Sequence, residues 1–104
     1  MGPRTTELLE RLDQMSQLLL AVGEVYWSEW FAKDAETIRA GNFSGVDHFL
    51  GAFGGMGSVN DLIIDPRNRH KVTAAQAVEV NRLLQDLLSQ AYGLAKELQQ
   101  RGEK

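Results

Sequence analysis

Hydrophobic residues recur at helical spacing near the start of the chain. They stand three or four positions apart at Leu8, Leu12, Met15, Leu19, Val22 and Tyr26. This spacing places them on one face of a helix. It predicts a first helix over residues 5–22, with Thr5 or Thr6 as its N-cap. Gly23 interrupts the pattern and either ends this helix or bends it.

Aromatic residues mark a second predicted helix, over residues 25–40. Its apolar positions also have helical spacing: Trp27, Trp30, Phe31, Ala35 and Ile38. Gly41 follows them and is typical of the residue after a helix. A short third helix is expected over residues 44–53, because Ser44 and Asp47 form a variant of the N-terminal capping box.

The strongest pattern lies in the last part of the chain. Thr73 and Gln76 form a capping box, and apolar residues follow at a strict alternation of three and four positions: Ala77, Val80, Leu84, Leu87, Ala91, Leu94 and Leu98. A helix is predicted over residues 74–100, about 40 Å long at 1.5 Å per residue. The two long helices are expected to pair antiparallel, with the shorter aromatic helices covering the groove between them.

Residues 54–72 form a glycine-rich and basic loop before the last helix. Gly54, Gly55 and Gly57 prevent a continuous helix and are expected to form a tight reversal. Ser58 and Asp61 repeat the Ser-x-x-Asp pattern, which favours a helical turn near residues 60–63 over a short extended segment. The chain is therefore predicted to be one all-α domain, a small helical bundle spanning residues 1–104.

Composition narrows the classes of function. The chain has 104 residues, no cysteine and a net charge of −3, so disulfides and cysteine-ligated metals are excluded. Residues 1–65 carry ten acidic and four basic residues, a balance of −6, and residues 66–104 carry seven basic and four acidic ones, a balance of +3. This distribution does not predict nucleic-acid binding. The only basic cluster, Arg67 to Lys71 with His70, is expected to be a solvated connection.

The longest aliphatic run, Leu18–Val22, is far shorter than the roughly 20 residues of a membrane span. We therefore expect no membrane association. The absence of cysteine gives no indication of an oxidising compartment, so a cytoplasmic protein is expected.

Candidate catalytic groups are few. His48 and His70 are the only histidines; we expect His48 to be at the surface or partly packed, and His70 to be solvated. No spacing typical of a metal site is present, so neither metal nor cofactor is predicted. An enzyme would need Ser58, Asn60, Asp61 and His70 to meet through folding of the glycine loop onto the basic loop. The sequence therefore favours a protein that is not an enzyme.

Two features offer binding surfaces. The glycine segment either binds an anion with the backbone amides of residues 54–57, aided by Ser58 and Asn60, or lets a partner approach closely while Met56 and Ser58 supply contacts. Of Trp27 and Trp30, at least one is expected in the core and the other is a candidate interface residue. Four nearby acids could attract a basic partner: Glu24, Glu29, Asp34 and Glu36.

Residues 25–65 resemble a family of small bacterial proteins of unknown function. The resemblance rests on the paired tryptophans, on the segment from Arg39 to Leu50, and on A-F-G-G-M-G-S-x-N-D-L at Ala52 to Leu62. Proteins similar to this one are associated with polymorphic toxin systems, which implies an immunity or antitoxin role. The resemblance implies no catalytic residues.

The sequence thus favours a non-enzymatic interaction protein that binds and blocks a cognate toxin through a basic surface of that toxin. The expected contact residues are Trp27, Glu29, Trp30, Met56, Ser58, Asn60 and Asp61. Two alternatives remain: a small-ligand or anion-binding module that uses the glycine loop, and a homo-oligomeric structural protein whose subunits meet along the stripe from Ala77 to Leu98.

Overall fold

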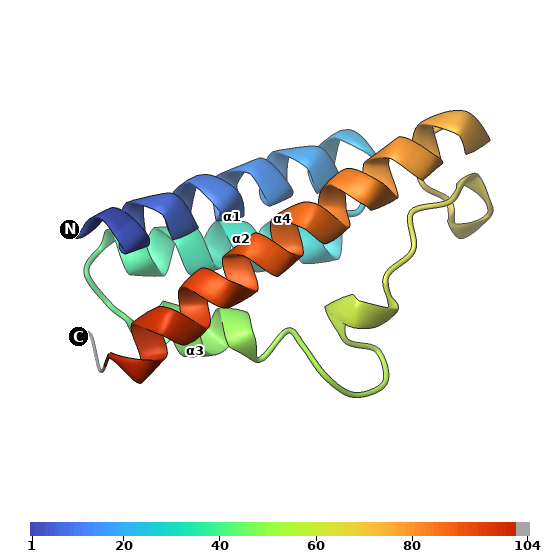
Figure 1. Ribbon diagram of the computed structural model, residues 1–104. Helices are drawn as coiled ribbons and strands as arrows, with labels where there is room; N and C mark the ends of the chain where they lie inside the picture. The colour runs from blue at the N-terminus through green and yellow to red at the C-terminus, as the bar shows by residue number, and fades with distance from the viewer. Residues whose placement is uncertain (102–104) are drawn as a thin grey trace.

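Four α-helices and two short 3₁₀ helices make up the fold of the described residues. The computed structural model describes residues 1–101, which contain α1 (Pro3–Ala21), α2 (Val25–Arg39), α3 (Ser44–Leu50), η1 (Val59–Asp61), η2 (Pro66–Asn68) and α4 (Ala74–Gln100). α4 runs antiparallel to α1 and packs on it, while α2 packs on α1 and α3 lies against α2 and α4 (Figure 1). The predicted all-α bundle with two long antiparallel helices is confirmed.

The apolar stripe of α1 forms the centre of the core. Leu8, Leu12, Met15 and Leu19 are fully buried, as their spacing predicts. Tyr26 does not continue this stripe and is 62% exposed. The reason is Gly23, which has a φ of +80° and redirects the chain, so that the helical phase restarts in α2. The helix also begins earlier than predicted, because Pro3 occupies its first turn, where a missing N–H costs nothing.

The long α4 follows its sequence signals closely. Thr73 accepts a hydrogen bond from the Gln76 backbone, and the Gln76 side chain accepts one from the Thr73 backbone, so the predicted capping box is present. The predicted stripe faces the core, with Val80 and Leu94 partly buried and its other members buried. Because the bundle itself covers this stripe, the stripe is not an exposed surface on which subunits could meet.

α3 begins where it was predicted to begin, but its N-terminal cap and its end differ from the prediction. It begins at Ser44 without a side-chain cap, because the Oδ1 atom of Asn42 accepts the hydrogen bond from the Ser44 backbone at 3.0 Å. It ends at Leu50, three residues earlier than expected. Gly45 allows α3 to approach α2 closely, since a Cβ atom there would lie 2.8 Å from Cγ1 of Ile38.

The segment between α3 and α4 is irregular but attached to the bundle at several points. The backbone of Val59 donates to Ala52 at 2.8 Å, and that of Lys71 donates to Val22 at 2.8 Å. Ile64 is fully buried, and the Asn81 side chain of α4 pairs with both its N–H and its carbonyl at 2.8 Å. The favoured helical turn is present as η1, but it lies earlier than residues 60–63, and Leu62 already has an extended conformation. The segment is therefore a fixed part of the molecule's surface.

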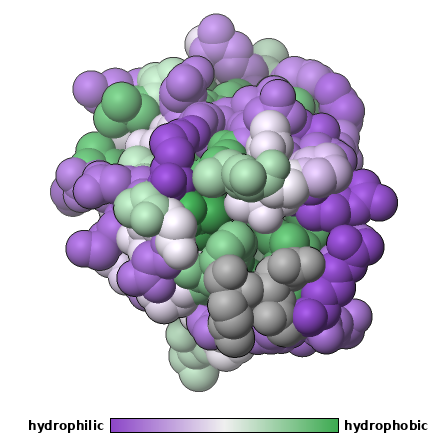
Figure 2. Space-filling model, turned by 90° about the vertical axis from the view of Figure 1, so that its left-hand side faces the viewer, coloured by the Kyte–Doolittle hydropathy of each residue, from purple (hydrophilic) through white to green (hydrophobic). Residues whose placement is uncertain are grey.

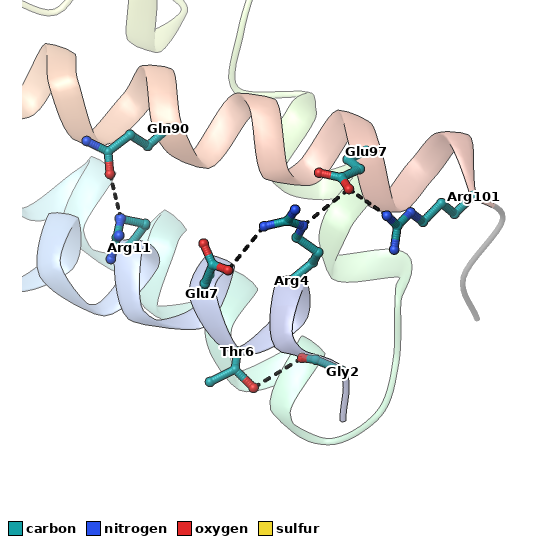
Figure 3. Close-up of polar contacts among 8 residues, drawn as sticks. All are labelled: Gly2, Arg4, Thr6, Glu7, Arg11, Gln90, Glu97 and Arg101. Carbon is teal, nitrogen blue, oxygen red and sulfur yellow. Dashed lines mark hydrogen bonds and ion pairs between the residues drawn. The ribbon is translucent and has the colours of Figure 1, made fainter.

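Polar pairs connect the exposed edges of α1 and α4 (Figure 3). Arg4 lies 3.2 Å from Glu97, and Arg11 donates to Gln90 at 2.7 Å. Glu97 also pairs with Arg101 at 2.8 Å. Exposed pairs of this kind contribute little stability, so the apolar stripes, rather than these pairs, hold α1 and α4 together.

The apolar core reaches the surface at the end of the bundle that carries the N-terminus (Figure 2). A hollow of about 440 Å³ lies there, lined by the start of α1, the α2–α3 turn and the end of α4. Its apolar lining includes Pro3, Ile38, Phe43 and Leu98.

Candidate functional site

The glycine loop, residues 54–58, reverses the chain after α3. Gly54, Gly55 and Gly57 have φ angles of +84°, +82° and +78°, a conformation that other residues rarely adopt. A Cβ atom at any of the three would meet nothing within 4 Å. The glycines are therefore needed for the backbone conformation and not for close packing.

Two side chains of η1 fix this loop. The Oδ1 atom of Asn60 accepts hydrogen bonds from the Gly54 backbone at 2.7 Å and from the Ser58 hydroxyl at 3.3 Å. The Oδ2 atom of Asp61 accepts one from the Gly57 backbone at 2.8 Å. The structure thus brings the predicted residues Ser58, Asn60 and Asp61 together, as partners of the loop itself. The amides of Gly54 and Gly57 are occupied by these side chains, which removes them from the set expected to hold an anion.

Met56 stands at the tip of the glycine loop. Its side chain is 99% exposed, the highest value among the exposed large hydrophobic residues of the described chain. A thioether in water is an apolar group without a packing partner, and methionine adapts its shape to many surfaces. The fixed loop therefore holds an apolar, adaptable side chain away from the bundle.

An open groove of about 570 Å³ lies beside the glycine loop. α3, the start of the loop, η1 and α4 contribute its walls. Its lining consists of Leu50, Phe53, Gly54, Asn60, Gln85, Leu88, Ser89, Tyr92, Lys96 and Gln99. Gly54 and Asn60 belong to both features, so the loop and the groove form one continuous part of the surface.

The aromatic residues of α2 form a separate cluster. The ring centroids of Trp27 and Trp30 are 5.1 Å apart, and Tyr26 meets Trp27 edge to face at 5.0 Å. Trp27 is buried, with 8% of its surface exposed, while Trp30 is partly buried. Trp27 is therefore a core residue and not an accessible contact residue; within this cluster Tyr26 is the exposed ring, which the sequence pattern did not indicate.

A buried carboxylate beneath this cluster was missed in the sequence. Asp34 is 1% exposed, and its Oδ1 atom is hydrogen-bonded to Nδ1 of His48. The His48 ring stacks on Trp30 with centroids 4.2 Å apart. Burial raises the pKa of Asp34 to about 6, against the lowering effects of the hydrogen bond and charge of His48. The Oδ2 atom of Asp34 and the Nε1 atom of Trp30 are buried without a hydrogen-bond partner in residues 1–101.

His70 is also placed differently from its prediction. It is 9% exposed rather than solvated, with Nε2 at 2.9 Å from Glu24 and Nδ1 accepting from the Asp65 backbone at 3.0 Å. The side chain of Arg67 hydrogen-bonds to Asp65 and lowers the pKa of that carboxyl to about 2. His70 thus connects the segment between η2 and α4 to the turn between α1 and α2. It has no hydrogen bond with Ser58, Asn60 or Asp61 among residues 1–101.

The acidic residues on and beside α2 do not form one continuous acidic surface. Asp34 is buried, and Glu24 is paired with His70, whereas Glu29 and Glu36 are exposed. A basic partner would therefore meet Glu29 and Glu36 on α2. These residues belong to α2 and not to the glycine loop, so the predicted contact residues fall into two groups.

The described part of the chain contains no group of three or more histidine, aspartate or glutamate side chains that could hold a metal ion. Within the same residues, no helix has both the length and the apolar character needed to cross a membrane.

Comparison with known proteins identifies the family but not an activity. No curated protein and no solved structure matches the chain. The model of a family described as a domain of unknown function, DUF6966, matches residues 20–73. These residues contain α2, α3, the glycine loop, η1 and η2, and they make up more than half of the chain. The protein therefore belongs to the DUF6966 family.

Proposed function

We propose that this protein is a non-enzymatic interaction module that binds another protein through its glycine loop, and that the partner is a toxin that it neutralises. The observation that carries the proposal is Met56, an almost fully exposed apolar side chain at the tip of a loop whose backbone is fixed by Asn60 and Asp61. The proposal that the partner is a toxin depends on the family resemblance of residues 25–65.

Fixing the loop before binding favours association. A flexible loop loses conformational entropy when a partner immobilises it, which weakens affinity. Here the hydrogen bonds from Gly54 and Gly57 to η1 are already formed, so less entropy remains to be lost. Residues that dominate binding energy insert into pockets of the partner. Met56 has the shape and position for such an insertion.

The surface next to the loop also suits a protein partner better than a bound inorganic anion. The amides of Gly54 and Gly57 already donate to Asn60 and Asp61, and the exposed Asp61 adds negative charge beside them. This arrangement favours basic groups on the partner's surface around an apolar pocket that receives Met56.

A co-expression experiment tests the proposal. The protein would be produced with the product of the adjacent gene, and complex formation and rescue of growth would be measured. Substitution Met56→Glu places a charge in the partner's pocket and is expected to weaken binding by at least about tenfold. Val78→Glu is the matched control, because Val78 is also an exposed apolar residue, at 72%, but lies on α4.

The expected result is a complex that Met56→Glu disrupts and Val78→Glu preserves. Failure to form a complex and to rescue growth would overturn the toxin proposal. A complex that is insensitive to Met56→Glu would overturn the assignment of the glycine loop as its contact.

A further inference from the structure

The groove beside the glycine loop has the size of a ligand site. Its volume of about 570 Å³ falls within the range of about 300–1,000 Å³ typical of small-molecule sites. It is open to solvent, so a ligand could enter without movement of a helix. Binding there would not require the protein partner proposed above.

One wall of the groove is apolar. Leu50 and Phe53 are partly buried, and Leu88 is buried, so their exposed edges are held in place by the core. Phe53 meets Tyr92 edge to face, with centroids 4.9 Å apart. Tyr92 keeps 40% of its surface exposed. A flat or branched apolar group could therefore displace water from two aromatic rings and from Leu50.

The other wall offers polar groups and a single charge. Among residues 1–101, Lys96 is the only charged residue in the lining, and no carboxylate of the same residues lies within 4 Å of it in an ion pair. Its ammonium group donates to Oε1 of Gln99 at 3.3 Å, while Nε2 of Gln99 donates to Asp47 at 3.1 Å. Gln99 thus holds the ammonium group at the end of the groove.

Asn60 completes this polar wall. Its Oδ1 atom accepts from Gly54 and Ser58, which fixes the amide, and its Nδ2 donates no hydrogen bond to residues 1–101. A carboxylate accepts hydrogen bonds from both ammonium and amide groups, and charged hydrogen bonds are the stronger kind. Lys96 is the one cation that residues 1–101 contribute to the lining, while the carboxylates of Asp47, behind Gln99, and Asp61, beside the loop, lie close by. This charge balance suits a ligand with one negative charge rather than a phosphate ester with two.

We propose that this groove binds a small monocarboxylate with an aromatic or branched aliphatic body. Its carboxylate pairs with Lys96, and its apolar body lies against Phe53 and Tyr92. The geometry combines an apolar wall for affinity with a single cation that selects for the acid over its neutral analogues.

An amide NMR titration with 3-phenylpropionate and its neutral amide, 3-phenylpropionamide, tests the inference on the full chain. The acid is expected to shift signals of residues lining the groove and to bind at least about tenfold more tightly than the amide. Lys96→Gln should remove the preference for the acid. Tyr92→Ala should weaken both compounds.

Arg82→Gln serves as the matched control. Arg82 is an exposed cation on the same helix, paired with Glu79 and Asp86 and absent from the lining; its loss should leave both affinities unchanged. Equal binding of acid and amide by the native protein, a preference for the acid that persists in Lys96→Gln, or no shifts in the groove up to millimolar concentration would each overturn the inference. None of these results depends on whether Met56 binds a protein.

Discussion

The Nδ1 atom of His48 on α3 is hydrogen-bonded to the buried Oδ1 atom of Asp34 on α2, fourteen residues earlier in the chain. The carboxyl group has no other partner among residues 1–101, since its Oδ2 atom is buried and unpaired. One face of His48 stacks on Trp30. The contact between α2 and α3 therefore includes an ionisable group in a largely apolar setting, and this has consequences for pH dependence.

Substitution Asp34→Asn is expected to change the pH dependence of stability. Compared with the native protein, the variant should have a higher free energy of unfolding at neutral pH than at acidic pH. The pKa of Asp34 is raised from 3.8 to about 6 in the folded state by burial. Between these values the unfolded chain loses the proton while the folded chain keeps it, so the native protein's free energy of unfolding falls as pH rises from about 4 to about 6. The contribution is at most about 3 kcal/mol. The amide side chain of the variant carries no titrating proton and escapes this loss.

Chemical denaturation of both proteins across this pH range measures the effect. The difference in free energy of unfolding, variant minus native, should increase with pH and level off above about pH 6. Glu36→Gln, at an exposed carboxylate of the same helix, is the control and should give a flat difference. A difference for Asp34→Asn that is flat or decreases with pH would contradict the prediction.

A pair of glycine substitutions tests the close packing of α3 on α2. In Gly45→Ala the new Cβ atom would lie 2.8 Å from Cγ1 of Ile38 and 3.1 Å from the carbonyl oxygen of Asp34, so either the Ile38 side chain or α3 must shift. We expect a loss of about 1–3 kcal/mol, as for other overpacked sites. Gly93→Ala in α4 meets nothing within 4 Å and should gain up to about 1 kcal/mol from helix propensity. Thermal unfolding of both variants would show opposite changes; equal changes would contradict the argument.

The sequence predicted features that depend on residues close together in the chain, and it did not predict contacts between residues far apart in the chain. α4 was predicted correctly because its capping box and its apolar stripe are local signals. His70 was not, since its partner Glu24 lies 46 residues away, and a basic loop gives no indication of such a contact. Asp34 was assigned to the surface for the same reason. Its burial depends on the packing of α3 against α2, and the spacing of apolar residues within α2 gives no indication of that packing.

Within the candidate site, local signals predicted the glycine reversal and the turn at η1, but not what η1 does. Asn60 and Asp61 are predicted to contact a partner, and that prediction did not include their hydrogen bonds with Gly54 and Gly57. The groove was not predicted at all, because Phe53 and Tyr92 come from distant segments of the chain and meet only in the folded protein.

Removal of each η1 side chain is expected to loosen its own part of the glycine loop. Asn60→Ala deletes the acceptor of the Gly54 amide, and Asp61→Ala deletes that of Gly57. A hydrogen bond of this kind is worth about 1 kcal/mol, or roughly fivefold in the exchange rate of the amide. Amide exchange by NMR should therefore accelerate at Gly54 in the first variant and at Gly57 in the second. Each variant is the control for the other, and exchange that changes at both sites or at neither would contradict separate fixation.

Asn81 is expected to be the most sensitive polar residue of α4. Its amide donates to the carbonyl of Ile64 and accepts from the N–H of Ile64, each at 2.8 Å, and Ile64 is fully buried. In Asn81→Ala the N–H and the carbonyl of Ile64 both lose their hydrogen-bond partner. Because Ile64 is buried, water does not readily take the place of the amide, and each unpaired group costs about 1–3 kcal/mol. A loss of at least about 2 kcal/mol in the free energy of unfolding is expected.

The neighbouring Ile63 provides the comparison for Asn81, because its side chain is 60% exposed. Ile63→Ala should change the free energy of unfolding by no more than about 0.5 kcal/mol. Asn81→Asp separates the two hydrogen bonds: a carboxylate still accepts from the Ile64 N–H but repels its carbonyl oxygen. If the loss in Asn81→Asp increases with pH as the carboxyl group ionises, the donor half of the pair is essential. A loss in Asn81→Ala no larger than that in Ile63→Ala would show that the segment before α4 is held by its apolar contacts instead.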